Sequence, residues 1–139
     1  MLRTWPRWIP IAVVVLMPVG AHAEKLYLVC NNTTIEGFED ENGKIWPEIP
    51  YINPMHVTVD FDARTVAGAV GGNPAKFQRD ATESEISFAV DNRNNPSYLI
   101  THEDGVINRI DGQLQVTWWY RDGRVAFIKG RCYRGTPQF

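Results

Sequence analysis

The chain has 139 residues, of which 22% are charged and 44% hydrophobic, and its formal net charge is −2. Two of the fourteen basic residues lie in residues 1–23, so residues 24–139 carry twelve basic against sixteen acidic side chains, a net charge of −4. A nucleic acid or an anionic membrane surface is bound through an excess of Lys and Arg, so neither is an expected partner.

Residues 1–23 are typical of a cleavable signal peptide. Two arginines give a positive start, an apolar run follows at residues 9–19, and Ala21-His22-Ala23 has the small residues that signal peptidase requires. The apolar run is shorter than the ~20 residues that a membrane-spanning helix needs. We therefore expect a mature protein that begins near Glu24, is periplasmic or secreted, and has no stable membrane insertion.

The chain has two cysteines, Cys30 and Cys132, and both lie in the expected mature part. An exported protein meets an oxidising environment, and no Cys-x-x-Cys pair points to a metal site. We predict a Cys30–Cys132 disulfide, which closes a loop of about 100 residues and contributes about 4–5 kcal/mol by constraining the unfolded chain. Such a bond requires the first and last strands to lie side by side or to face each other across a core.

The first strand is expected at residues 25–30, where apolar side chains alternate, and Asn31-Asn32 is expected to end it. Two glycines and three prolines then interrupt residues 31–54. We expect one long irregular loop there, with at most one short edge strand. Loops of this length in a compact domain often carry function.

Short strands alternate with turns from residue 55 to the end of the chain. Period-2 alternation of apolar side chains predicts strands near residues 56–61, 66–70, 76–79, 85–90, 98–101, 106–110, 113–120 and 125–132. Asp111-Gly112 is the clearest hairpin signal, and a further turn is expected at Glu103-Asp104-Gly105.

These strands predict an all-β fold, an antiparallel meander of about eight short strands in a single domain at residues 24–139. The meander either closes as a lipocalin-like barrel or folds as a sandwich. The barrel is favoured because closure removes exposed edges and because the disulfide joins the terminal strands.

Residues that could carry catalysis form no recognisable constellation. His56 and Asp60 share a strand face, but four residues along a strand separate them by about 13 Å. The two histidines of residues 24–139, His56 and His102, have no metal-binding spacing, and no serine lies in a Gly-x-Ser-x-Gly elbow. We expect no enzymatic activity, no cofactor and no metal.

Trp118-Trp119-Tyr120 places two tryptophans on opposite faces of one strand. With Trp118 in the core, Trp119 faces outward and could, beside Trp46, offer a platform to a sugar ring or to an apolar residue of a partner. The favoured interpretation is that Trp119 packs beneath residues 31–54 and holds them in place.

Three consecutive acidic residues, Glu39, Asp40 and Glu41, give the expected loop its own candidate chemistry. They could bind a basic partner or a calcium ion, although the ligand spacing of an EF-hand is absent and a solvated loop is favoured. The candidate binding surface therefore consists of these three residues together with Trp46 and Trp119.

One segment also carries a family resemblance. Residues 105–114, Gly-Val-Ile-Asn-Arg-Ile-Asp-Gly-Gln-Leu, precede Gly130-Arg131-Cys132, and Cys30 follows a short first strand. This pattern, mainly at residues 105–132, resembles a loosely defined group of small uncharacterised secreted proteins of Gram-negative bacteria. The resemblance implies a periplasmic or secreted protein and no established activity.

Together these observations predict an exported, non-enzymatic β domain that binds a protein or a small molecule and is a monomer. One alternative is a carrier of a small apolar ligand in the barrel interior, because eight strands leave room for side chains or for one small ligand. A small hydrolase is the other alternative, with no motif in its support.

Overall fold

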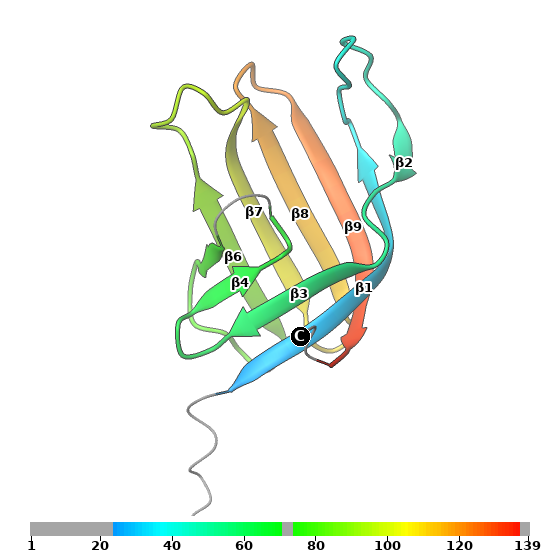
Figure 1. Cartoon of the computed structure of the whole chain (residues 1–139). Helices are drawn as coiled ribbons and strands as arrows, with labels where there is room; N and C mark the ends of the chain where they lie inside the picture. Colours follow the sequence, from blue (N-terminus) through cyan, green and yellow to red (C-terminus); the bar gives the residue numbers. More distant parts are fainter. Residues whose placement is uncertain (1–23, 71–73, 137–139) are drawn as a thin grey trace, which may run out of the picture.

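The described part of the chain forms one antiparallel sheet of nine strands, and eight of them close into a barrel (Figure 1). The computed structural model describes residues 24–70 and 74–136, and the expected signal peptide at residues 1–23 lies outside them. The strands are β1 (Lys25–Glu36), β2 (Glu48–Pro50), β3 (Met55–Asp60), β4 (Thr65–Ala67), β5 (Ala75–Phe77), β6 (Glu85–Asp91), β7 (Ile100–Asn108), β8 (Gln113–Tyr120) and β9 (Val125–Arg134).

The strand order confirms the predicted meander and the barrel, and the sandwich alternative is wrong. Each strand from β4 to β9 pairs with the strand before it, and β1 pairs with both β3 and β9, which closes the circle. The short strand β2 adds to β1 outside this circle. In the described ranges no helix is long and apolar enough to cross a membrane.

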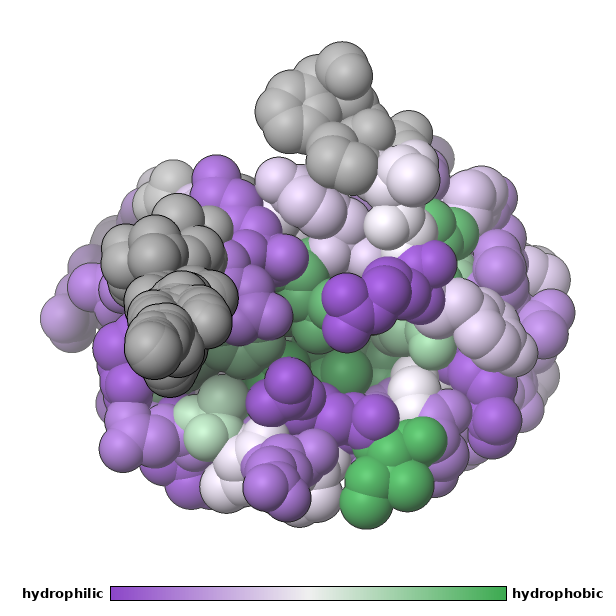
Figure 2. All heavy atoms as spheres, turned by 90° about the horizontal axis from the view of Figure 1, so that it is seen from below, coloured by the Kyte–Doolittle hydropathy of each residue, from purple (hydrophilic) through white to green (hydrophobic). Residues whose placement is uncertain are grey.

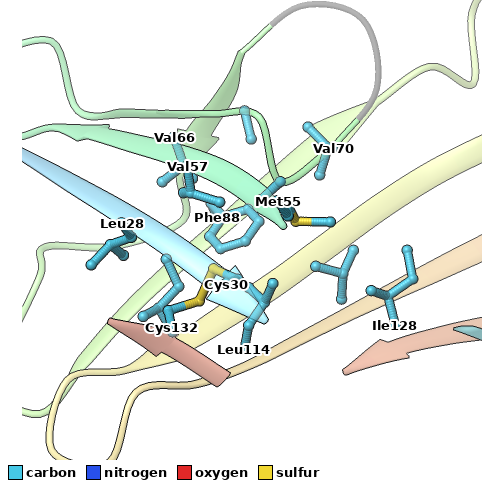
Figure 3. Packing of buried hydrophobic residues seen from close by; sticks show 14 of the residues in the cluster. Leu28, Cys30, Met55, Val57, Val66, Val70, Phe88, Leu114, Ile128 and Cys132 are labelled. Carbon is cyan, nitrogen blue, oxygen red and sulfur yellow. A yellow bond between two sulfur atoms is a disulfide. The ribbon is translucent and has the colours of Figure 1, made fainter. Parts of the chain in front are cut away.

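The predicted disulfide is present and lies at the closure. Cys30 of β1 and Cys132 of β9 are directly opposite each other in the paired strands, and their sulfur atoms are bonded. Figure 3 shows this bond among buried side chains from several strands, with Leu28, Phe88 and Leu114 nearby. Each of these three is at most 8% exposed, so the bond is part of the apolar core.

The expected end of the first strand at Asn31 is wrong, and residues 31–54 are not one long irregular loop, although the short edge strand expected there is present as β2. β1 continues to Glu36 because the chain makes a bulge between Asn31 and Thr34, where Asn32 takes a positive φ of 55°. Asparagine tolerates this conformation, so the strand bends instead of ending. The bulge also changes which residues face inward, and Thr33 is therefore fully buried.

The bend in β1 is fixed by the segment that leads into β3. The Asn53 side-chain oxygen accepts hydrogen bonds from the Thr33 backbone N–H and hydroxyl, each at 2.7 Å. The Asn53 amide nitrogen donates to the Thr33 carbonyl at 3.2 Å. The remaining irregular stretch, residues 37–47, is itself a small hairpin with a bridge between Glu39 and Ile45.

The turn expected at Glu103-Asp104-Gly105 is also wrong, because β7 runs straight through these residues. Gly105 lies directly opposite Phe88 of β6. A Cβ atom on Gly105 would lie 2.5 Å from the Phe88 ring and 2.9 Å from the Gln115 carbonyl oxygen. The glycine therefore makes room for a core aromatic ring and does not turn the chain.

Gly105→Ala should lower the free energy of unfolding by about 1–3 kcal/mol, the usual cost of adding a methyl group to a packed core. Urea denaturation measures this loss. Phe88→Leu frees space beside position 105, so in that background Gly105→Ala should cost less than in the natural protein. If the double variant lost the sum of the free energies of unfolding that the two single variants lose, the contact between position 105 and the Phe88 ring would not explain the cost.

Candidate functional site

The barrel has two ends, which Figure 1 shows at the top and the bottom of the molecule. The upper end carries the hairpin at residues 37–47, the β6–β7 connection and the β8–β9 turn, and the lower end carries the β7–β8 turn. The side chains that face the interior differ in polarity between the upper and the lower end of the barrel.

Glu103 is the only charged residue that is buried in the described part of the chain, and it is 5% exposed. It lies on β7, whose register shifts between Ile100 and His102, and this irregularity sets which residues of β7 face inward. Beyond the shift, Glu103, Gly105 and Ile107 are buried in alternation. The strand therefore places one carboxyl group inside an otherwise apolar barrel.

Three aromatic residues accompany Glu103, and together the four form the upper interior cluster. Trp118 of β8 lies directly opposite Glu103, and Trp118 and Tyr120 are 9% and 4% exposed. The ring of Tyr51, which follows β2, packs edge-on against Trp118 at 5.9 Å between centroids. The backbone N–H of Tyr51 donates to the Thr33 carbonyl at 2.9 Å, so the bend in β1 also positions this ring.

The polar groups of the upper interior cluster act on one another. Burial raises the pKa of the Tyr51 hydroxyl, and the neighbouring Glu103 carboxylate and Tyr120 raise it further. The Trp118 indole N–H is buried and has no hydrogen-bond acceptor among the described residues. Transfer of an N–H group out of water is costly unless a partner compensates for it. The cluster therefore places a carboxyl group and an unused indole donor between aromatic rings.

An ion-pair network covers the cluster at the upper end. The Arg124 guanidinium lies 4.8 Å from the centroid of the Tyr120 ring and forms ion pairs with Glu39 and with Asp122, the latter at 2.8 Å. Hydrogen bonds from the Arg124 backbone N–H and guanidinium hold the pKa of Asp122 below its usual value. The predicted site residue Glu39 thus links the hairpin at residues 37–47 to the β8–β9 turn.

The other predicted residues of the hairpin mostly stabilise the hairpin itself. Asp40 accepts hydrogen bonds from the backbone N–H groups of Asn42 and Lys44, each at 2.9 Å, and from the Trp46 indole N–H at 3.0 Å. The Lys44 and Trp46 bonds are the main reasons why the pKa of Asp40 is lowered. The Lys44 ammonium lies 3.7 Å from the Trp46 ring centroid, and Glu41 is exposed.

Trp119 lies on the outward face of β8, and its ring contact among the described residues is with His102 of β7, at 5.0 Å between centroids, and not with residues 31–54, beneath which it was expected to pack. Trp46 contacts Lys44 and Asp40, so no contact joins the two tryptophans in the described ranges. Trp119 lies in an open groove of about 340 Å³ on the outer face of the barrel.

The lower end has a different hollow, of about 520 Å³, with an apolar floor that includes Leu26, Leu28 and Ile107. Figure 2 looks onto this end and shows apolar side chains in the middle, surrounded by hydrophilic ones. Arg109 and Arg134 lie at the hollow together with Glu83 and Asp111, so its charges balance.

Sequence reasoning missed Glu103 and Tyr51. Glu103 was assigned to a turn because Glu-Asp-Gly is a turn sequence, and Tyr51 was assigned to the irregular loop. A signal for Glu103 was present, since it continues the two-residue spacing of Gly105 and Ile107. Tyr51 has no such signal, because its position depends on the bend in β1.

The molecule is a small antiparallel β-barrel with a buried carboxyl group among aromatic rings. Its disulfide fits an oxidising, extracytoplasmic location. Comparisons with protein-family models, with curated proteins and with solved structures find no match to this chain. The function therefore has to be argued from the geometry of the chain itself.

The raised pKa of Tyr51 predicts a loss of stability at high pH. The neutral hydroxyl is favoured in the folded protein, so this stabilisation is present below the ordinary tyrosine pKa of 10.0 and is lost as the pH rises through the folded value. The free energy of unfolding should therefore fall between about pH 9 and pH 11. Tyr51→Phe should reduce this fall, as urea denaturation at both pH values would reveal. An equal fall in the two proteins would contradict the assignment.

Proposed function

We propose that this protein is an exported, non-enzymatic β-barrel, periplasmic or secreted, that binds a small organic cation in the upper interior cluster. The leader at residues 1–23 and the Cys30–Cys132 disulfide support export. The observation that carries the proposed ligand class is Glu103, a carboxyl group buried among Trp118, Tyr120 and Tyr51.

The chemistry of these four residues matches an amine or a quaternary ammonium ion. Aromatic rings attract a cation through their faces, and this attraction grows when the site excludes water. A carboxylate supplies the opposite charge, and the Trp118 indole N–H is available to an oxygen atom of the same ligand. A hydroxylated amine such as choline combines the two features.

Charge at the upper end favours the approach of a cation. Residues 36–48 contain five acidic residues and one basic residue, Lys44. Asp122 offsets the charge of Arg124, so this network leaves the acidic excess of residues 36–48 unchanged. A net negative charge on residues 36–48 raises the local concentration of cationic ligands and their rate of association.

Choline should perturb the NMR signal of the Trp118 indole N–H in a saturable manner, whereas its neutral carbon analogue 3,3-dimethyl-1-butanol should not. Glu103→Gln keeps the shape of the side chain but removes the charge, and it should weaken choline binding at least tenfold, about 1.4 kcal/mol. Glu41→Gln, at an exposed position of the rim, is the matched control and should change the affinity by less than about threefold.

Two results would refute this function. One is the absence of any response of the Trp118 signal to choline and to the diamine putrescine at about 10 mM, well above a millimolar dissociation constant. The other is equal choline affinity in the natural protein and in Glu103→Gln.

The carrier of a small apolar ligand stays as a second candidate because the hollow at the lower end has an apolar floor (Figure 2). Decanoate, as an apolar probe, would then perturb the methyl signals of Leu28 and Ile107 and leave the Trp118 indole unchanged. The two candidate functions therefore predict NMR signal changes at opposite ends of the barrel, at the upper end with choline and at the lower end with decanoate.

A further inference from the structure

The outer face of the barrel has a groove that the proposed cation site does not use. We call it the Trp119 groove, and its lining includes Arg93, Thr101, His102, Trp119 and Arg121. Trp119 and Trp118 are neighbours on β8 and point to opposite faces of the sheet. The sheet thus separates the indole of Trp119 from that of Trp118, and Tyr120 borders both the groove and the upper interior cluster.

The floor of the groove is aromatic and held in place. The Trp119 and His102 rings are 5.0 Å apart and inclined at 47°. The Nε2 atom of His102 lies 3.6 Å from Asp104 on its own strand. The Thr101 hydroxyl donates to the Trp119 carbonyl at 3.2 Å, which secures the backbone beneath the ring. A ligand would therefore meet a preorganised surface.

The charges around the groove are already engaged within the chain. Arg93 donates to both carboxylate oxygens of Asp91, at 2.6 to 3.1 Å. Because of these bonds the pKa of Asp91 is strongly lowered, and the two groups remain a neutral pair at ordinary pH. The Nε2 atom of His102 lies 3.6 Å from a carboxylate oxygen of Asp104. A charged ligand would have to compete with these pairs.

Arg121 is engaged with the backbone. Its guanidinium donates to the carbonyl oxygens of Asn95 and Tyr98, at 3.0 and 2.9 Å, and so fixes the β6–β7 connection at the edge of the groove. An arginine has five N–H donors in a fixed plane, so it can bind these carbonyls and still donate to a ligand hydroxyl.

We propose that the Trp119 groove binds a neutral saccharide, with one sugar ring lying against the indole of Trp119. The C–H groups of a sugar ring pack against an aromatic face, and its hydroxyls accept hydrogen bonds from guanidinium groups. The groove volume of about 340 Å³ lies at the small end of the range for ligand sites, which suits one or two sugar rings in an open groove. Arg93 is paired with Asp91, and the Arg121 guanidinium already donates to two backbone carbonyls, so a neutral sugar that needs only hydrogen bonds suits the groove better than an acidic one.

Cellohexaose, chitohexaose and maltohexaose are suitable neutral probes, and an oligogalacturonide is the acidic comparison. At least one neutral probe should shift the NMR signal of the Trp119 indole N–H and leave that of Trp118 unchanged. Trp119→Ala should weaken this binding at least about tenfold, and Trp119→Tyr, which keeps a flat ring, should weaken it less. Trp46→Ala removes another partly exposed tryptophan and should leave the affinity unchanged.

The proposal is overturned if none of the three neutral probes shifts the Trp119 signal at about 10 mM. It is also overturned if binding is as tight in Trp119→Ala as in the natural protein, or if only the acidic saccharide binds. If Trp119→Ala does not fold, the saccharide titrations of Trp119→Tyr and of the natural protein still test the proposal. Glu103→Gln should bind the saccharide normally, so the failure of one site is distinguishable from the failure of the other.

Discussion

The pairing of β1 with β9 is the contact on which the rest of the structure depends, because it turns an open meander into a barrel. β1 has neighbours on both edges, with β9 on one side and β2 and β3 on the other. The Cys30–Cys132 bond fixes the register of this closure inside the core. The hydrogen bonds between Thr33 and Asn53 fix the bend that lets one strand serve both ends of the barrel.

Closure also separates three chemical environments. In the lower part, inward side chains such as Phe88 and Leu114 fill the interior. At the upper end, the same inward direction collects Glu103 and its three aromatic neighbours. On the outer face, the opposite direction exposes Trp119 beside His102. The alternation of side chains along β7 and β8 thus places the two proposed sites back to back on one pair of strands.

The sequence was sufficient to predict the features that depend on local pattern or on compartment. The meander, the barrel and the disulfide follow from the alternating strands, the turns between them and two cysteines behind a predicted leader. The outward direction of Trp119 follows from the same alternation. The bulge at Asn32 and the straight path of β7 through Gly105 were missed, because asparagine and glycine also mark turns and only tertiary contacts decide between the two. Tyr51 and Glu103 meet as a consequence of these two features, so their cluster was beyond prediction.

Hydrogen exchange of the backbone amides, compared between the oxidised and the reduced protein, tests the role of the closure most directly. If the Cys30–Cys132 bond holds the β1–β9 pair, reduction should speed the exchange of the hydrogen-bonded amides of both strands by at least about thirtyfold, which corresponds to a loss of ~2 kcal/mol. Equal exchange in β1 and β9 before and after reduction would contradict the account.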